Sequence, residues 1–178
     1  MKKLENKNPA VTGFKAAGVH CGIKNKKIKD LALVVSEVPS TAAAVFTKNR
    51  VVSPGVTWSR RALAKSGRCR AVIVNSGNAN AVTGLKGLKD CDAITKKISD
   101  ELGIPQNEVF IASTGIIGVP LPLEKILKAT PNLISKLGKQ AKDWVEASEA
   151  IMTTDLVSKS NKVSYKFKDQ RIEIGGIT

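Results

Sequence analysis

Short apolar runs bounded by turn residues predict the strands of this chain. Three such runs stand at residues 31–35, 71–74 and 109–112. Apolar runs of this length between polar turns are typical of strands that are buried on both faces. We therefore predict strands at 31–39, 70–74 and 109–112, and a further strand at 42–49.

Apolar residues that recur every three or four positions predict the helices. The clearest set forms one helix face that ends before Gly103; its members are Leu88, Cys91, Ile94, Ile98 and Leu102. A shorter helix is expected from Thr57, its N-cap, to Gly67. A third and longer helix is expected to begin at Pro131, after the N-cap residue Thr130, and to end near residue 152.

The C-terminal part of the chain alternates in polarity, as a β-hairpin does. Apolar side chains stand at every second position on both sides of a turn near Asp169; they are Val163, Tyr165, Phe167, Ile172 and Ile174. Residues 1–30 are expected to form a loop-like lead. Since no repeat or linker separates the predicted elements, we expect residues 1–178 to form a single mixed α/β unit.

The composition is that of a globular chain. Of its 178 residues 42% are hydrophobic and 25% charged, which argues against a disordered chain and a coiled coil. No apolar run approaches the ~18–20 residues that a membrane span needs. No secretory signal is expected, because no hydrophobic stretch follows the first lysines. Three cysteines without a CxxC pair suggest reduced thiols in a cytoplasmic protein, and the single histidine excludes a multi-histidine metal site.

The net charge of +14 is the one unusual number. Strong basicity raises nucleic-acid binding as a hypothesis, because Lys and Arg neutralise phosphates. The lysines are scattered, however, and aromatic residues make up only 4% of the chain, so stacking platforms are not evident. A surface that favours solubility, or one complementary to an acidic partner, explains the charge equally well.

Four short segments could carry chemistry, and each also has a purely structural interpretation. His20 and Cys21 could form a thiolate site, but neighbours in sequence usually point apart. The asparagines of residues 75–80 could bind a ligand or satisfy local backbone groups. The Ser-Thr-Gly of residues 113–115 could stabilise an oxyanion with a hydroxyl and a backbone N–H, or form an ordinary turn. The Thr-Thr-Asp of residues 153–155 could contact a substrate or terminate a helix.

Taken together and in this order, six segments resemble one family, the glutamate N-acetyltransferases of arginine biosynthesis, also called ornithine acetyltransferases. The segments are GFKAAGVHCGIK (13–24), DLALVVSEVPSTAAAVFTKN (30–49), RAVIVNSGNANAVTGLKGLKD (70–90), VFIASTGIIGVPLP (109–122), EAIMTTD (149–155) and IGG (174–176). NSGNANAVTG and STGIIG are the most specific of these. The resemblance extends over nearly the whole chain but covers only the N-terminal part of the family's precursor.

The resemblance implies an N-terminal-nucleophile type of enzyme. The family's precursor cuts itself before a threonine, which gives an α chain and a β chain whose new N-terminal Thr is the nucleophile, with its own α-amine as general base. The acetyl group of N2-acetylornithine would pass to that Thr and then to glutamate in a ping-pong reaction. No cofactor or metal is implied, although some members also accept acetyl-CoA.

The chain would then be the α chain of this enzyme. The implied fold is a four-layer α-β-β-α sandwich that the β chain completes, assembled as an α2β2 heterotetramer. Thr114 and Gly115 match the family's oxyanion hole, and Thr153 matches a substrate-contacting position, with Thr154 as the alternative. A related self-cleaving amidase or aminopeptidase is the alternative activity.

Three features depart from the family pattern. In the family a Lys-Gly-Ser-Gly stretch and the cleaved junction follow the Gly-Gly pair, whereas this chain ends at Thr178 before them. Thr178 is therefore not expected to be the nucleophile, which belongs to the β chain. Cys91 stands where a small residue is expected and is interpreted as packing. The net charge of +14 argues for an acidic β chain or for substrate steering.

Overall fold

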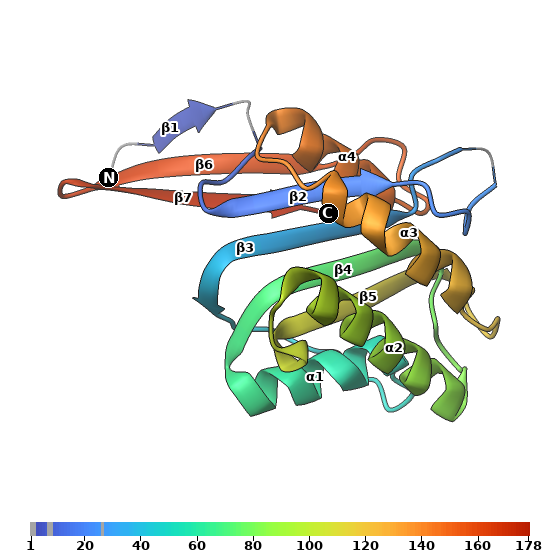
Figure 1. Cartoon of the computed structure of the whole chain (residues 1–178). Helices are drawn as coiled ribbons and strands as arrows, with labels where there is room; N and C mark the ends of the chain where they lie inside the picture. The colour runs from blue at the N-terminus through green and yellow to red at the C-terminus, as the bar shows by residue number, and fades with distance from the viewer. Residues whose placement is uncertain (1–2, 7–8, 26) are drawn as a thin grey trace.

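Two β-sheets form the centre of the molecule (Figure 1). The computed structural model describes residues 3–6, 9–25 and 27–178. In this part of the chain a four-stranded sheet has the order β2 (Phe14–Val19), β3 (Leu31–Thr41), β4 (Arg68–Asn78), β5 (Val109–Ile116). Its first three strands pair antiparallel, and β4 and β5 pair parallel. A smaller antiparallel sheet has the order β1 (Lys3–Asn6), β6 (Ser160–Phe167), β7 (Gln170–Ile177).

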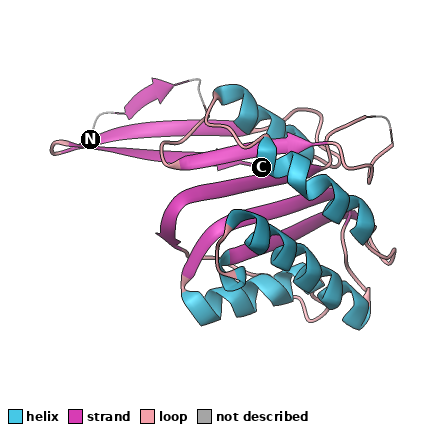
Figure 2. Cartoon of the chain, viewed as in Figure 1, coloured by secondary structure: helices cyan, strands magenta, loops and turns pink. Residues whose placement is uncertain are grey.

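Helices cover both faces of the four-stranded sheet (Figure 2). Alternate strand residues such as Leu33 and Ile73 pack against α1 (Pro54–Ser66), α2 (Gly84–Leu102) and α3 (Leu123–Ser135). The residues between them point to the opposite face, where Ala16 and Ala32 pack against α4 (Ala141–Ile151). A short 3-10 helix, η1 (Gln106–Glu108), leads into β5. Because both faces of the sheet are covered, neighbouring residues along a strand are apolar, and the strands appear in the sequence as continuous apolar runs.

The structure confirms the predictions that rest on strong local patterns. The strands expected at 31–39, 70–74 and 109–112 lie within β3, β4 and β5. The predicted helix that ends before Gly103 is α2, and Gly103 adopts the left-handed conformation (φ 62°) of a helix C-cap. The C-terminal hairpin is β6–β7, in which Tyr165 pairs with Ile172. The mixed α/β class is therefore confirmed.

The predicted loop over residues 1–30 is wrong, because β1 and β2 lie within it. The sequence of β2 contains small residues with little strand propensity, and its pairing with β3 and its packing against α4 stabilise it instead. Gly18 allows this packing, since a Cβ atom there would lie 2.0 Å from the backbone oxygen of Glu146 in α4. Strand Gly often marks such a close approach of another backbone.

The strand predicted at 42–49 is also wrong, because these residues form no regular secondary structure. Their apolar pattern has no neighbouring strand to pair with. The side chain of Val45 is fully exposed, and the guanidinium of Arg60 lies 5.3 Å from the centre of the Phe46 ring. Residue composition alone therefore did not distinguish this segment from a buried strand.

Two helix boundaries differ from the prediction. The N-cap of α1 is Ser53, whose side chain accepts a hydrogen bond from the Val56 N–H, so that Thr57 lies inside the helix. The long helix expected from Thr130 and Pro131 is two helices: both residues lie inside α3, and the chain leaves helical geometry before α4. Gly138 stands in this interruption and exchanges backbone hydrogen bonds of 2.9 and 3.1 Å with Ala16 of β2.

In the described part of the chain no helix is long and apolar enough to cross a membrane.

Candidate functional site

The candidate site lies where the parallel strands β4 and β5 end. The α2 crossover brings their carboxyl ends to the same edge of the sheet, where α/β proteins commonly bind ligands. In this register Ser76 pairs with Thr114, and Gly77 pairs with Gly115. Thr114 and Gly115, the predicted oxyanion-hole residues, therefore lie near the end of the paired part of β5 and not in a free loop.

Gly77 and Gly115 allow an unusually close approach of backbones at this edge. Gly115 has a φ of +134°, and a Cβ atom there would lie 2.4 Å from the carbonyl carbon of Gly77. A Cβ atom on Gly77 would lie 2.9 Å from the Cγ2 atom of Ile23, which belongs to the loop before β3. Because any side chain would push these layers apart, glycine at both positions keeps the strand ends and the loop in contact.

The Thr114 hydroxyl is free to bind a ligand. Its side chain is half-buried, and it makes no hydrogen bond with any of the described residues. The neighbouring hydroxyl of Ser113, by contrast, donates to Oδ1 of Asn75 at 2.6 Å. A hydroxyl without a protein partner, next to a glycine N–H, is suited to a developing negative charge on oxygen.

The end of α4 is fixed to the same edge of the sheet. Ser76 Oγ donates a hydrogen bond to the backbone oxygen of Ala150, and Lys24 Nζ donates to that of Met152. Thr153 and Thr154 follow directly and are exposed. The structure thus brings the Thr153 segment to the strand ends, but no hydrogen bond joins it to Thr114 within the described residues.

The carboxylate of Asp155, the last residue of the Thr-Thr-Asp segment, is hydrogen-bonded on both sides. A hydrogen bond from Lys159, and a second one from the backbone N–H of Thr153, hold the pKa of Asp155 below its usual value. The Thr153 backbone is therefore oriented by Asp155, while its hydroxyl makes no hydrogen bond with the described part of the chain.

Asp30 is a central residue of the site that the sequence interpretation missed. Its fully buried carboxylate accepts four backbone N–H bonds, from Cys21 (2.6 Å), Gly22 (3.1 Å), Ile23 (2.7 Å) and Lys24 (2.9 Å). These bonds wrap the loop over Gly77 and place Lys24 against the end of α4. The signal in the sequence was a lone acidic residue at the start of an apolar strand, preceded by a basic, glycine-containing segment.

The asparagines of residues 75–80 have the structural role, as one of the two interpretations held. Asn75 Nδ2 donates to the backbone oxygen of Asn78 at 2.8 Å, and Asn78 Oδ1 accepts from the Asn80 N–H at 2.8 Å. Asn80 Nδ2 in turn donates to the backbone oxygen of Gly87 at the start of α2. These amides join the end of β4 to α2 and so fix the edge on which Thr114 lies.

The adjacent His20 and Cys21 do not form a thiolate site. Burial, together with the charge of Asp30, raises the pKa of the Cys21 thiol to about 12, so the thiol is neutral at physiological pH. His20 Nδ1 lies 2.7 Å from the backbone oxygen of Ile28. Cys91 is also buried and packs between α2 and the sheet, in agreement with its interpretation as a packing residue.

The fold and these strand ends define a mixed α/β protein with a candidate oxyanion-binding site. A sequence model of the ArgJ family matches residues 15–178, and the chain therefore belongs to the ArgJ family. The resemblance seen in the sequence motifs is confirmed by this match.

Two curated relatives are both described as arginine biosynthesis bifunctional protein ArgJ. The chain is 42% identical to the protein from Caldanaerobacter subterraneus over 99% of its own length, and 43% identical to the one from Gloeobacter violaceus over 94%. It covers 43% and 41% of these relatives, so it spans about two fifths of their length.

Two crystal structures share the fold over nearly their whole chains. One is the arginine biosynthesis bifunctional protein ArgJ from Bacillus halodurans, with a TM-score of 0.94 and 34% identity, covering 99% of this chain and 93% of that one. The other is ornithine acetyltransferase from Mycobacterium tuberculosis in complex with ornithine, with a TM-score of 0.92 and 36% identity, covering 99% and 94%.

Proposed function

We propose that this chain is the α chain of an acetyltransferase that moves the acetyl group of N2-acetylornithine to glutamate. The observation that carries the proposal is membership of the ArgJ family combined with a free threonine hydroxyl at the strand ends. The complex of the M. tuberculosis relative with ornithine supports it, because ornithine is the product left when N2-acetylornithine gives up its acetyl group. In this proposal residues 1–178 are the N-terminal part of a self-processed precursor.

The reaction proceeds by ping-pong transfer through a threonine at the N-terminus of the β chain. Its hydroxyl oxygen attacks the acetyl carbonyl, its α-amine accepts the hydroxyl proton, and the carbonyl oxygen becomes negatively charged. Loss of the ornithine amine, which takes up a proton, leaves an acetyl ester. The amine of glutamate then attacks this ester, and the acetyl group leaves as N-acetylglutamate.

In this mechanism Thr114 and Gly115 stabilise the negative oxygen. The Thr114 hydroxyl and the Gly115 backbone N–H would each donate one hydrogen bond to it. A donor of this kind stabilises a transition state by about 2.7–4 kcal/mol. Thr153, or Thr154 beside it, would contact the substrate from the end of α4.

The partner in this proposal is a β chain from the same precursor, in an α2β2 assembly. An apolar groove of about 520 Å³ separates the second face of the four-stranded sheet from β7, and Val34, Val72, Val74 and Ile174 line it. Trp144 lines this groove, and its indole N–H is buried without a hydrogen-bond partner among the described residues. An unpaired buried donor costs about 1–3 kcal/mol, which an acceptor on the β chain would offset.

The lengths of the relatives support a two-chain protein. The solved ArgJ and ornithine acetyltransferase chains are covered to 93% and 94%, whereas the curated full-length relatives are covered to about two fifths. We propose that the β chain supplies the remainder and completes the four-layer α-β-β-α sandwich. An acidic β chain would also balance the net charge of +14.

Acetyl transfer by the complete polypeptide that contains this chain tests the proposal. Thr114→Ala is expected to lower kcat/KM for transfer from N2-acetylornithine to glutamate about 100- to 1000-fold, because one oxyanion donor is lost. Thr114→Ser retains the hydroxyl and keeps most of the activity. Thr41→Ala is the matched control and changes kcat/KM only slightly, because Thr41 is an exposed threonine that pairs with Arg68 at the other end of the sheet.

Three results would contradict parts of the proposal. Unchanged turnover of Thr114→Ala would remove Thr114 from the oxyanion hole. Hydrolysis of peptides without transfer to glutamate would assign the protein to the self-cleaving amidases or aminopeptidases. Intact-mass measurement of the purified protein is expected to show a second polypeptide that begins with Thr, and a stable lone chain of 19.0 kDa would refute the two-chain assembly.

A further inference from the structure

A groove between α1 and α2 forms a second cavity, far along β5 from the candidate site. Its volume is about 540 Å³, which falls within the range of small-molecule pockets, about 300–1,000 Å³. Gln106 and Asn107, which precede β5, close one end, whereas Thr114 and Gly115 stand at the opposite end of that strand. The groove also lies on the sheet face opposite to α4, so the proposed partner chain would leave it open.

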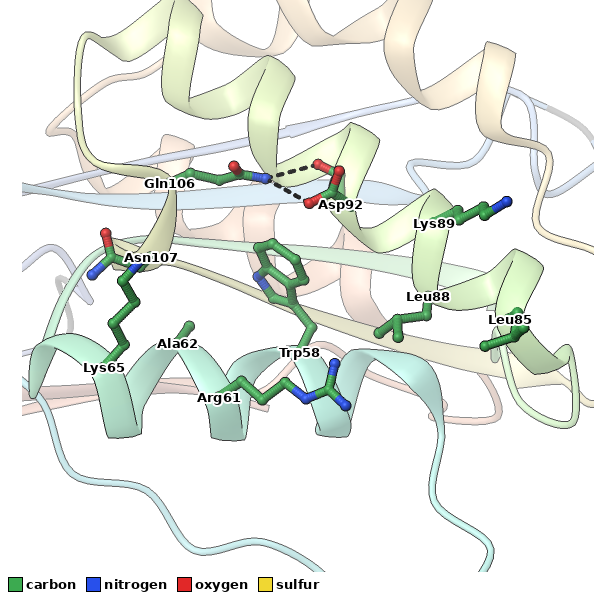
Figure 3. A pocket seen from close by; sticks show the side chains of 10 residues that line it. All are labelled: Trp58, Arg61, Ala62, Lys65, Leu85, Leu88, Lys89, Asp92, Gln106 and Asn107. Atoms are coloured by element: carbon green, nitrogen blue, oxygen red, sulfur yellow. Dashed lines mark hydrogen bonds between the residues drawn. The ribbon is translucent and has the colours of Figure 1, made fainter.

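A flat apolar surface forms the middle of this α1–α2 groove (Figure 3). The Trp58 ring stands between the two helices, and Leu85 and Leu88 extend toward α1 from α2. The indole N–H of Trp58 donates to the backbone oxygen of Val109 at 3.2 Å, which fixes the ring. Since this bond uses the polar group of the indole, the ring offers a ligand its apolar face.

Three positively charged side chains around this surface form no ion pair with the described residues. Arg61 and Lys65 come from α1, which has no acidic residue, and Lys89 comes from α2. None of the three forms an ion pair or a hydrogen bond with the described residues, whereas Lys86 of the same helix pairs with Asp90 at 2.7 Å. Lys65 extends toward Asn107 and Arg61 lies along α1 below Leu88, while Lys89 points away from the centre of the groove (Figure 3).

The lining also contains one carboxylate, that of Asp92, which accepts a hydrogen bond from a neutral amide. Gln106 Nε2 donates to the Asp92 backbone oxygen at 3.0 Å and to its Oδ1 atom at 3.2 Å. Gln106 also donates to Thr95, so these contacts hold the amide against α2. The groove thus combines a fixed aromatic face with an excess of unpaired cations, which is complementary to an anion that carries a flat ring.

We propose that the α1–α2 groove is a binding site for a small organic anion in which a planar ring is joined to a phosphate or carboxylate group. The ring would stack on Trp58 between Leu85 and Leu88. The anionic group would bind Arg61, whose planar guanidinium can hold a phosphate or carboxylate with two hydrogen bonds. Lys65, which extends toward the other end of the groove, would attract the anion over a longer distance. The site is independent of acetyl transfer, because no residue of the strand ends contributes to it.

Isothermal titration calorimetry of the complete protein tests this site with ADP, which contains both a planar ring and phosphates. ADP is expected to bind at least tenfold more tightly than either adenosine or pyrophosphate, because base stacking on an aromatic ring adds about tenfold or more. Raising the salt concentration weakens ADP binding, since exposed charges are screened.

Variants locate the binding to the groove. The double change Arg61→Gln and Lys65→Gln is expected to weaken ADP binding about tenfold, from the loss of two exposed charge contacts. Leu85→Glu places a negative charge at a side chain that is 79% exposed, so folding tolerates it while ADP binding is lost. Lys128→Gln is the control, because Lys128 is an exposed lysine of α3 outside the groove, and it leaves binding unchanged.

Several outcomes would overturn the proposal. Absence of ADP binding at millimolar concentration would reject the site, as would full binding to the double variant. If pyrophosphate bound as tightly as ADP, the ring would contribute nothing, and the binding would be a non-specific attraction to surface charges. Tighter binding of a polyglutamate peptide than of ADP would assign the groove to an acidic protein segment instead. None of these results depends on whether the protein transfers acetyl groups.

Discussion

The clearest structural prediction concerns Asp30, whose carboxylate holds the loop that covers the strand ends. Asp30→Asn keeps the size of the side chain but replaces one acceptor oxygen with an NH2 donor. Oδ2 accepts three backbone N–H bonds, from Gly22, Ile23 and Lys24, and Oδ1 accepts one from Cys21. Even if the amide oxygen takes the Oδ2 position, the new NH2 group faces the Cys21 N–H, and both donors are left unpaired.

The magnitude follows from these contacts. One hydrogen bond to a charged group is lost, which costs about 1.5–3 kcal/mol, and a buried donor without a partner costs a further ~1–3 kcal/mol. We therefore expect Asp30→Asn to lower the free energy of unfolding by about 2.5–6 kcal/mol, a large part of the ~5–15 kcal/mol that stabilises a typical domain. Loosening of the loop also releases Lys24 from Met152, so the Thr153 segment loses one of its anchors.

Urea denaturation of the complete protein measures this change. Asp92→Asn is the control, because Asp92 is exposed and the Asn oxygen can still accept the hydrogen bond from Gln106, so it is expected to change the free energy of unfolding by less than about 0.5 kcal/mol. A loss below about 1 kcal/mol in Asp30→Asn would show that the four N–H bonds do not stabilise the loop as the geometry indicates.

Two further predictions concern packing and thiol chemistry. Gly18→Ala places a Cβ atom 2.0 Å from the backbone oxygen of Glu146, so we expect urea denaturation to show about 3 kcal/mol of destabilisation. Gly176→Ala, where a Cβ atom has no neighbour within 4 Å, is the control and is expected to change the stability little. Equal effects of the two changes would refute the close contact at Gly18. Burial raises the pKa of Cys21 to about 12, so roughly one Cys21 thiol in a thousand is ionised at pH 9. Mass spectrometry is therefore expected to show that iodoacetamide labels Cys21 far more slowly than it labels glutathione. Labelling at the glutathione rate would contradict a neutral, buried thiol.

The amino-acid sequence by itself determined the elements with strong local signals. Residues 31–39, 70–74 and 109–112 read as buried strands because both faces of the sheet are covered, and α2 ends where Gly103 can adopt a left-handed conformation. The motifs around Thr114 also identified the family, because an ordered set of short motifs is specific even where each motif alone also fits an ordinary turn.

Only the tertiary structure decided which weak signals were real. The small residues of β2 form a strand because β3 and α4 pack on it, whereas residues 42–49 pair with no strand and stay irregular. The helix expected from Thr130 to about residue 152 is interrupted near Gly138, where the backbone pairs with Ala16, far away in the sequence. Asp30 acquires its role in the same way, through a loop folded back onto it. Local sequence patterns indicate which residues are buried. They do not indicate which distant segments pair, because those contacts form only in the tertiary structure.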